Sequence, residues 1–434
     1  MNCNWSVKKL GDLVKFTSGG TPSKSNEAYW GGDIPWISAS SMDSTRYSES
    51  DLKVTTEGSK NGTRLVPKDT VLLLVRGGAL HNKIPVGITT REVTFNQDVK
   101  ALVPKTDEIT PWYLLFWLIS IKKTLLAKVE NTGIGAGKLD TKILQELEVP
   151  LPPQSELKRL EKFCKALDDK IILNSDTNQT LEQMAQAIFK SWFVDFDPVK
   201  AKMNREQPEG MDAATASLFP EKLVESELGL IPDGWEIKPI KDLCSKVQNG
   251  GTPKRSESSY WDNGDIPWLT SGEVRQSIIT SVENRITQLG LDKSSAKWVP
   301  ELSTLVALYG ATAGEVSLTS IPLTTNQAVC ALMPKKEHQW YNYLQLKSRV
   351  AELAGKAVGS AQQNISKGLV ESTEVLSVPE SLLEAFNAQV ENLFKLRICN
   401  LQENVELGNL RDTLLPKLLS GEIELDVAEI NTND

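Results

Sequence analysis

The chain is poor in the two side chains that most often hold metals. Its 434 residues include two histidines, His81 and His338, and five cysteines. The cysteines are scattered and odd in number, and none forms a Cys-x-x-Cys pair. We therefore expect neither a histidine-based metal site nor a disulfide framework. Isolated cysteines of this kind are typical of a protein of the reducing cytoplasm.

Long apolar runs are also missing. The longest, from Trp112 to Ile121, is half as long as the roughly 20 residues that a membrane-spanning helix needs. No apolar segment follows Lys8 and Lys9, so we expect no signal peptide. With 40% hydrophobic and 24% charged residues, the composition is that of a folded cytoplasmic protein. Its length allows two to four domains.

Recognisable catalytic motifs are absent from the sequence. A nucleotide-binding P-loop requires Gly-x-x-x-x-Gly-Lys-Ser/Thr, but the nearest match has Thr132 at the first glycine and Leu139 after Lys138. The only double proline, Pro152-Pro153, lacks the flanking residues of an adenine methyltransferase loop. We therefore expect no catalytic residue, no metal and no cofactor in this chain.

The net charge of −8 is unfavourable for a protein that binds nucleic acid, but the charge is unevenly distributed. Residues 1–152 carry a net charge of +3, and residues 231–379 are neutral. The excess of acidic residues lies at 201–230 and, with a net charge of −7, at 380–434. The two large blocks can therefore still present basic side chains on one face.

The chain contains one long internal repeat. Its matching segments are Gly-Gly-Thr-Pro at 19–22 and 250–253, Tyr-Trp at 29–30 and 260–261, Asp-Ile-Pro-Trp at 33–36 and 265–268, and Asn-Gln at 96–97 and 326–327. The offset stays between 226 and 232 residues along the chain. So many separated matches are not chance, and we interpret the chain as a tandem duplication of one module.

Each module is predicted to begin with about 150 residues that are rich in β-strands and contain some helix. Short apolar segments such as Val71–Val75 and Leu305–Leu308 lie between Gly, Pro, Asn and Ser residues, as is typical of strands. Thr110-Pro111 predicts the start of a helix that runs to about Lys128, and Trp340–Leu353 is its counterpart.

A long amphipathic helix is predicted at the end of each module, because apolar residues recur at spacings of three and four, the pattern of a coiled-coil seam. The first seam comprises Leu157, Leu160, Cys164, Leu167, Ile171, Asn174, Asn178, Leu181, Ala185, Ile188 and Trp192. The second comprises Leu383, Phe386, Val390, Leu393, Arg397, Asn400, Asn404, Leu407, Arg411 and Leu414, each 226 residues after its counterpart. We expect Pro416 to close the second helix.

Two asparagines lie in the middle of each seam: Asn174 and Asn178 in the first, Asn400 and Asn404 in the second. A buried asparagine in a seam costs stability but fixes the register of helix pairing. In an antiparallel pair the two middles meet, so we predict that these four residues lie opposite one another and set the register. The alternative is that each helix lies on its own module and the asparagines face water.

Three phrases carry a resemblance to a known family. They are Leu181-Glu-Gln-Met-Ala-Gln-Ala-Ile-Phe-Lys-Ser-Trp-Phe-Val-Asp-Phe-Asp-Pro198, Leu410-Arg-Asp-Thr-Leu-Leu-Pro-Lys-Leu-Leu-Ser-Gly-Glu-Ile423 and Glu227-Leu-Gly-Leu-Ile-Pro-Asp-Gly-Trp235. With the Gly-Gly-Thr-Pro segments, they resemble the specificity (S) subunits of type I restriction–modification systems over nearly the whole chain, in the family's order and spacing.

The resemblance implies an α+β fold with two similar target-recognition domains, which two long antiparallel coiled-coil helices separate. Each recognition domain then reads one half of a split site in double-stranded DNA. Two methyltransferase subunits dock on the helices, and restriction–translocase subunits join them in some complexes. S-adenosylmethionine, ATP and Mg²⁺ belong to those partners. The chain itself is then a non-catalytic subunit.

These implications define the expected organisation. The recognition domains lie at 1–152 and 231–378, and the long helices at 153–197 and 379–420. A linker at 198–230 and an acidic tail at 421–434 complete the chain. Two alternatives stay open: an orphan DNA-binding or regulatory protein, and a coiled-coil scaffold without a catalytic partner.

No motif identifies the residues that read bases, so the DNA-binding candidates rest on chemistry alone. Arginine and lysine in loops suit phosphate and guanine. The candidates are Lys24, Arg46, Lys60, Arg64, Arg76 and Lys83 in the first module, and Lys254, Arg255, Arg275, Lys293 and Lys297 in the second. Asn96, Gln97, Asn326 and Gln327 recur in both modules, so we expect them to hold the fold.

Overall fold

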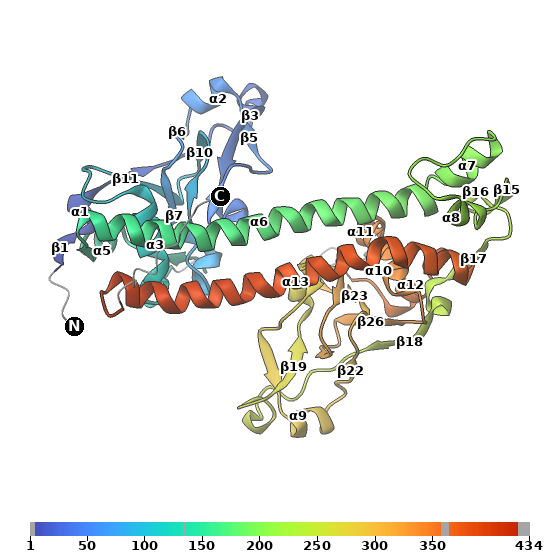
Figure 1. Cartoon of the computed structure of the whole chain (residues 1–434). Coiled ribbons are helices and arrows are strands. Elements are labelled where there is room, and N and C mark those ends of the chain that lie inside the picture. Colours follow the sequence, from blue (N-terminus) through green and yellow to red (C-terminus); the bar gives the residue numbers. More distant parts are fainter. Residues whose placement is uncertain (1–4, 133–134, 357–363, 424–434) are drawn as a thin grey trace. The chain divides into compact units, whose positions relative to one another are not determined.

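A computed structural model describes residues 5–132, 135–356 and 364–423 (Figure 1). The chain divides into two compact units. Unit 1 comprises Met1–Leu173 and Asn404–Asp434, and unit 2 comprises Asn174–Glu403. Two 40-residue helices, α6 (Gln154–Phe193) and α13 (Glu380–Leu419), each contribute one part to unit 1 and the other part to unit 2.

Unit 1 is built mainly of short strands. They are β1 (Ser6–Lys9), β2 (Val14–Ser18), β3 (Trp30–Ile37), β4 (Arg46–Tyr47), β5 (Lys53–Val54), β6 (Arg64–Val66), β7 (Val71–Leu74), β8 (Arg76–Gly77), β9 (Val86–Thr89), β10 (Val93–Phe95), β11 (Val99–Pro104), β12 (Glu130–Asn131), β13 (Gly137–Lys138) and β14 (Glu148–Leu151). The main sheet has the order β2-β11-β7-β9-β4, in which only β9 and β4 are parallel. A smaller sheet has the order β5-β3-β10-β6.

The helices of unit 1 are α1 (Leu10–Leu13), α2 (Thr56–Lys60), α3 (Pro111–Ser120), α4 (Lys122–Leu126), α5 (Thr141–Gln145) and the first half of α6. Among them, α3 packs against the main sheet and α2 against the smaller sheet. The start of α3 confirms the predicted signal: the Thr110 hydroxyl accepts a hydrogen bond from the Tyr113 amide, and Pro111 occupies the first turn. Residues Tyr113–Ile119 are all buried, because α3 packs against β7 and β9.

Unit 2 repeats this architecture. Its strands are β15 (Leu223–Ser226), β16 (Gly229–Pro232), β17 (Glu236–Pro239), β18 (Cys244–Asn249), β19 (Ile266–Leu269), β20 (Ile278–Ile279), β21 (Asn284–Ile286), β22 (Trp298–Val299), β23 (Thr304–Ala307), β24 (Val316–Thr319), β25 (Leu323–Thr325), β26 (Val329–Pro334) and β27 (Glu374–Ser377). The sheets β18-β26-β23-β24-β20 and β21-β19-β25-β22 correspond strand by strand to those of unit 1. The predicted duplication is therefore present in the fold.

The helices of unit 2 include two that the sequence analysis assigned to a linker. The helices are α7 (Asp197–Met203), α8 (Ala213–Ser217), α9 (Gln288–Asp292), α10 (Gln339–Lys347), α11 (Val350–Gly355), α12 (Lys367–Glu371) and parts of α6 and α13. The segment 198–230, expected to be a linker, contains most of α7, all of α8 and most of the β15–β16 hairpin, beside the end of α6 (Figure 1). Its few apolar residues anchor it: Val199 and Phe219 are buried, and Phe219 stacks edge-on against Trp192.

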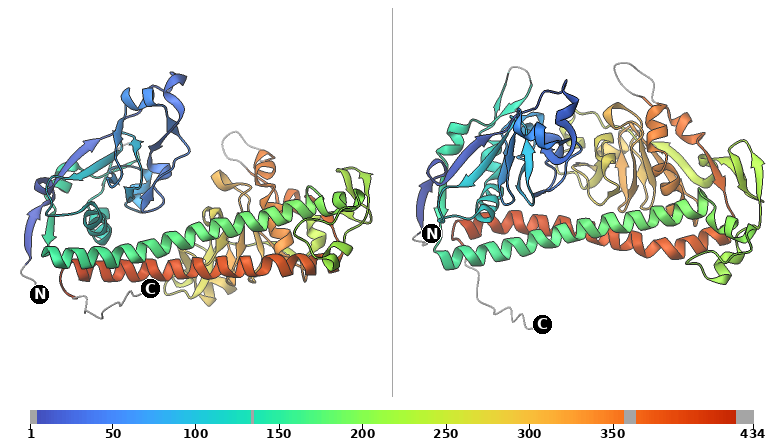
Figure 2. Two further views of the ribbon diagram at one scale, coloured as in Figure 1. Left: turned by 45° about the horizontal axis from the view of Figure 1, so that its top comes forward. Right: turned by 90° about the horizontal axis from the view of Figure 1, so that it is seen from above.

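Helices α6 and α13 pair antiparallel within each unit, as predicted (Figure 2). In unit 1 the start of α6 buries Leu157 and Leu160 in one cluster with Leu415 and Leu418. Each such leucine contributes roughly 1.5–3 kcal/mol of hydrophobic free energy. The prediction that Pro416 closes the second helix is wrong. The helix continues to Leu419, because burial of the side chains at its end offsets the hydrogen bond that proline removes.

The cysteines provide a test of this core. Cys164, Cys244 and Cys330 are buried, and burial raises the pKa of each thiol from 9.0 to about 12, whereas Cys399 is exposed. Since the thiolate is the reactive form, iodoacetamide at pH 8 should alkylate Cys399 and spare the three buried thiols. Mass spectrometry after brief labelling checks this, with urea-unfolded protein as the control in which all react. Equal labelling of Cys330 and Cys399 in the folded protein would contradict the packing.

The raised thiol pKa values also determine a direction of pH dependence. A neutral buried thiol stabilises the fold fully below the unfolded-state pKa near 9. This contribution is lost as the pH rises from 9 towards the folded-state value of about 12.

Candidate nucleic-acid interface

The Gly-Gly-Thr-Pro segment forms the same tight loop in both units. In unit 1 the Gly20 amide donates to the Phe95 carbonyl over 2.9 Å, and in unit 2 the Gly251 amide donates to the Thr325 carbonyl over 2.9 Å. A Cβ atom at Gly19 would lie 2.1 Å from the Phe95 carbonyl oxygen, and one at Gly250 would lie 1.9 Å from that of Thr325. Only glycine permits so close an approach of two backbones.

Two tryptophans hold each loop: both belong to β3 in unit 1, whereas in unit 2 Trp268 belongs to β19 and Trp261 precedes that strand. In unit 1 the indole nitrogens of Trp36 and Trp30 donate to the carbonyls of Gly20 and Ser23, over 3.0 and 3.1 Å. The equivalent bonds of unit 2 run from Trp268 to Gly251 and from Trp261 to Lys254, over 2.9 and 3.1 Å. The two rings of each pair meet edge to face, with centroids 5.4 and 5.1 Å apart. The repeated tryptophans therefore build a rigid loop support.

The repeated Asn-Gln pairs also hold this support. Gln97 accepts a hydrogen bond from Thr21, and Gln327 accepts one from Thr252, over 2.7 and 2.5 Å. The Asn96 and Asn326 side chains each accept from a backbone amide two residues on. These partners agree with the expectation that the residues common to both modules maintain the fold. What differs between the units is the set of side chains that the loops expose.

The loop residues differ after the shared proline, where Ser23-Lys24 in unit 1 corresponds to Lys254-Arg255 in unit 2. The guanidinium carbon of Arg255 lies 4.1 Å from the ring centroid of Trp261 and 4.8 Å from that of Trp268. Within the described parts of the chain, no carboxylate pairs with it. An exposed arginine stacked in this way keeps the edge of its guanidinium available for guanine or phosphate.

Most of the predicted DNA-binding residues gather around these loops and the smaller sheets. Those near the smaller sheet of their unit, all exposed, are Lys24, Lys60 and Arg64 in unit 1 and Lys254, Arg255, Lys293 and Lys297 in unit 2. They lie in the loop after Pro22 or Pro253, at the end of α2 or α9, and at or beside β6 or β22. The two units therefore present comparable basic surfaces, although no local pattern in the sequence indicated that these residues would gather.

The remaining candidates lie elsewhere. Arg76 is exposed on β8, and Arg275 ends the 3₁₀ turn Ser271–Arg275. Lys83 forms an ion pair of 2.9 Å with Asp43, in which both side chains are exposed. These three residues do not belong to the surface around the glycine loops.

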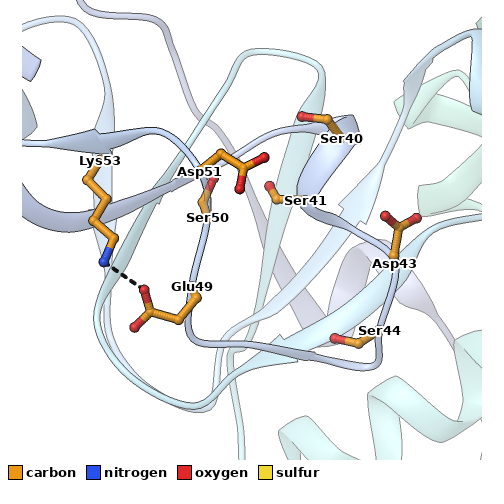
Figure 3. Close-up of a pocket in the computed structure, with 8 residues that line it drawn as sticks. All are labelled: Ser40, Ser41, Asp43, Ser44, Glu49, Ser50, Asp51 and Lys53. Atoms are coloured by element: carbon orange, nitrogen blue, oxygen red, sulfur yellow. Dashed lines mark ion pairs between the residues drawn. The ribbon is translucent and has the colours of Figure 1, made fainter. Parts of the chain in front are cut away.

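The neighbourhood of Lys83 is acidic. A hollow of about 550 Å³ is lined by the residues that Figure 3 draws: Ser40, Ser41, Asp43, Ser44, Glu49, Ser50, Asp51 and Lys53. Its single lysine pairs with Glu49 over 2.8 Å, and the hydrogen bond from Lys53 lowers the pKa of that carboxyl. Lys83 pairs with Asp43, and Lys53 and Arg91 pair with Glu49, so the cations of this region are already engaged by carboxylates. This hollow is therefore unsuited to face a DNA backbone.

Arg46, predicted to contact DNA, is instead committed to α6 within unit 1. Its Nε and Nη2 atoms lie 2.8 and 2.7 Å from Asp168, which is completely buried, and Nη2 lies 2.5 Å from Asp169. Although burial opposes the charge, the hydrogen bond to Asp169 and the charge of Asp168 raise the pKa of Arg46 above its ordinary value. This role of Arg46 could not be predicted from the sequence, because Asp168 lies beside the apolar seam and no local pattern marks it as a partner.

The seam asparagines lie where antiparallel pairing brings the two helices together. In unit 2 the Asn400 amide donates to Asn178 over 3.0 Å, and Asn174 donates to Glu403 over 2.7 Å. In unit 1 the Asn404 amide donates to the Ile171 carbonyl over 3.1 Å. Their hydrogen bonds join α6 to α13, as a role in setting the register requires.

A buried arginine in the second seam was not anticipated as an ionic contact. Arg397 is 2% exposed, and its Nη2 lies 2.7 Å from Glu182 of α6 and 3.2 Å from the Ser277 hydroxyl. Its guanidinium also lies 5.5 Å from the centroid of Phe394. The sequence did contain a sign of this contact, because Arg397 occupies a seam position and a charged side chain requires a partner when it is buried.

The described residues contain no cluster of side chains suited to hold a metal ion. Across 5–132, 135–356 and 364–423, no three His, Cys, Asp or Glu side chains come together as a metal ion would need. The glycine-rich near match to a P-loop lies partly outside the described residues, and its Gly137–Lys138 forms strand β13. None of the described helices has the length and apolar composition of a membrane crossing.

Known proteins resemble this chain over most of its length. The sequence profile of the type I restriction modification DNA specificity domain matches residues 2–183 and 232–381, one copy for each module. The MjaIX specificity subunit of Methanocaldococcus jannaschii is 27% identical over 98% of this chain and 94% of its own length. The HindI specificity subunit of Haemophilus influenzae is 31% identical over 74% of this chain and 79% of its own length.

One solved structure has a similar fold. The S subunit of a type I restriction–modification system from M. genitalium superposes with a TM-score of 0.54 and covers 96% of both chains. Its sequence identity to this chain is 14%, so the similarity concerns the arrangement of elements alone.

Proposed function

Because this chain belongs to the family of type I restriction–modification DNA specificity domains, we propose that it selects the DNA target of a type I complex. The observation that carries the proposal is the pair of identical loop supports with different exposed residues. A rigid support that is common to both units keeps the loops in place. Different side chains, such as Lys24 and Arg255, then read different half-sites.

The proposed target is bipartite. Recognition domain 1, at residues 1–152, reads one half-site, and recognition domain 2, at residues 231–378, reads the other. The paired helices α6 and α13 then serve as the docking region for two methyltransferase subunits, and for restriction–translocase subunits where these exist. The seam asparagines fix the register of that helix pair.

The chemistry of the proposed complex belongs to its partners. Adenine methylation uses S-adenosylmethionine, and cleavage uses ATP and Mg²⁺, none of which this chain is proposed to bind. Its own residues contact DNA and the partner subunits. This division supports a non-catalytic role for the chain within an enzyme complex.

Methylome sequencing tests the function directly. A host that expresses this chain with its methyltransferase partner should carry N6-methyladenine in one split motif. A host with the methyltransferase alone should lack it. Methylation in the same motif without this chain, or robust S-adenosylmethionine turnover by the purified chain alone, would refute the proposal.

The basic residues around the glycine loops provide a second prediction. Replacing Lys24, Lys60 and Arg64 with alanine in the reconstituted complex should weaken DNA binding. The slope of log K against log salt should fall by roughly 0.9 for each phosphate that the variant no longer neutralises. Titration of labelled DNA at several salt concentrations measures both effects.

Lys9 offers the matched control, because it is a basic residue of the same unit that lies on β1, outside the smaller sheet, and pairs with Glu146 over 2.6 Å. Its replacement with alanine should leave the salt slope unchanged. In contrast, Arg255→Ala should relax one base position at a cost of about 1–3 kcal/mol if its guanidinium reads guanine. Equal salt slopes for the triple variant and the control would show that the DNA-facing surface has been misplaced.

A further inference from the structure

Each recognition domain contacts a long helix through the end of its main sheet. In unit 1 the contact comprises Thr45, Arg46, Asp168 and Asp169, and we call it the β4–α6 contact. In unit 2 it comprises Ser277 and Arg397 beside Ile278 and Phe394, and we call it the β20–α13 contact. The two contacts occupy equivalent places in the repeat, but their chemistry differs.

The strands establish the equivalence on the domain side. Strand β4 pairs in parallel with β9, with Arg46 opposite Ile88, and β20 pairs in parallel with β24, with Ile278 opposite Leu318. Because β4 and β20 are the last strands of matching sheets, Arg46 corresponds to Ile278. Thr45 and Ser277, one residue earlier, are the corresponding hydroxyl residues.

The seam spacing establishes the equivalence on the helix side. Asp168 and Phe394 are 226 residues apart, as are all the corresponding seam positions. Both side chains are fully buried. The neighbouring aromatic ring is also repeated, because Trp340 stacks on Phe394 with centroids 4.4 Å apart, while Trp112 lies 5.1 Å from the Arg46 guanidinium.

The charges at the two contacts are arranged differently, because the ion pair of unit 1 joins the recognition domain to α6, whereas Arg397 of unit 2 pairs with Glu182 of α6. In unit 1 the cation, Arg46, belongs to the recognition domain, and the anion, Asp168, belongs to α6. The Thr45 hydroxyl also donates to Asp168, over 2.6 Å. In unit 2 the cation belongs to the helix, and the Ser277 hydroxyl accepts from Arg397 over 3.2 Å. The recognition domain of unit 2 has Ile278 in the place of Arg46, and Ile278 lies in the same buried cluster as Phe394.

We propose that the β4–α6 and β20–α13 contacts are complementary pairs that match each recognition domain to its own long helix. A copy of domain 2 on α6 would place an isoleucine against the buried carboxylate of Asp168. A copy of domain 1 on α13 would place Arg46 beside Phe394 and a second cation, Arg397. Either arrangement buries a charge without its counter-ion, which is strongly unfavourable. Arg46 and Asp168 are thus positioning residues, and this inference stands on packing, apart from any DNA contact.

A double-mutant cycle in the full chain tests the first contact. The variants are Arg46→Ile, Asp168→Phe and the double variant, which carries the residues of unit 2 at both positions. Arg46→Ile should lower the Tm of the chain by about 6–20 °C, because it leaves Asp168 buried and unpaired. The double variant should recover more than half of that decrease. Additive decreases in the double variant would overturn the proposal.

Arg91→Ile is the matched control. Arg91 lies in the same domain and pairs with Glu49 at 3.3 Å, but both side chains are largely exposed. Its replacement should change the Tm by no more than about 2 °C, because exposed ion pairs contribute little. If Arg91→Ile lowered the Tm as much as Arg46→Ile does, the decrease would reflect the loss of any arginine charge and not the loss of the β4–α6 contact.

A chimeric chain tests the matching itself. Residues 231–378 replace residues 1–152, so that domain 2 precedes α6, with and without Asp168→Phe. This substitution should raise the Tm of the chimera and lower the Tm of the natural chain. The proposal would be overturned if Asp168→Phe changed the Tm of the chimera and of the natural chain in the same direction. If the chimera fails to fold, additive effects in the double-mutant cycle would overturn it. Both readouts are thermal and use no DNA, so failure here is distinct from failure of the proposed function.

Discussion

Replacing Glu182 with alanine should lower the free energy of unfolding of unit 2 by about 3–5 kcal/mol. Glu182 is the counter-ion of Arg397, whose side chain is 3% exposed. Within the described residues, the Nε and Nη1 atoms of Arg397 have no hydrogen-bond acceptor, so its environment already tolerates the charge poorly. Without Glu182 the charge keeps its contacts with the Ser277 hydroxyl and the face of Phe394, but it has lost its carboxylate.

Thermal denaturation measures this effect. For a unit of this size, a decrease of 3–5 kcal/mol corresponds to a decrease in Tm of roughly 6–20 °C. The informative comparison is Arg397→Met, which removes the buried charge and fills the seam position with an apolar side chain of similar length. We expect that variant, and the double variant with Glu182→Ala, to lie within about 5 °C of the natural chain.

The order of the variants is the decisive result. If Arg397→Met destabilises the chain as much as Glu182→Ala, the ion pair itself stabilises the fold and desolvation does not dominate. If neither substitution matters, Arg397 is hydrated in solution. Asn178 contacts the backbone carbonyl of Arg397, so its hydrogen bond survives in every variant of this series.

Shortening both long helices by one heptad should shorten the nonspecific spacer of the DNA target by about three base pairs. Helices α6 and α13 run without interruption from one unit into the other, so both connections shorten together. Removal of 172–178 and 399–405 keeps the seam spacing on each helix. It removes about 10 Å of helix, with a rotation of about 20°. The half-site sequences should stay unchanged, because the loops are untouched.

Methylome sequencing of a host that carries the shortened chain is the measurement. Both deletions also remove the seam asparagines. The control is therefore a full-length chain in which Asn174, Asn178, Asn400 and Asn404 are replaced with leucine, so that it lacks the asparagines but keeps the length of the helices. Correctly paired control protein should methylate the natural spacer, although its register is less strictly defined. An unchanged spacer in the shortened chain, or altered half-sites, would show that the helices do not set the distance.

The sequence by itself determined the duplication, the two long helices and their pairing. These features rest on local patterns: matching segments at a constant offset, spacings of three and four, and asparagines at equal places in two seams. The strand at Val71–Leu74 and the start of α3 at Pro111 follow from the same kind of signal. Each pattern involves residues that are close in sequence or repeated, so no tertiary information was needed.

Only the tertiary structure decided which charged residues are free to meet DNA. Arg46 and Arg255 look alike in the sequence, but one is bound to Asp168, 122 residues away, and the other is stacked on the face of Trp261. The folding of the 198–230 segment likewise depends on Phe219 meeting Trp192. These outcomes arise from burial and from pairing between distant residues. A charge is satisfied or exposed according to what the fold places beside it, and neither composition nor periodicity identifies that neighbour.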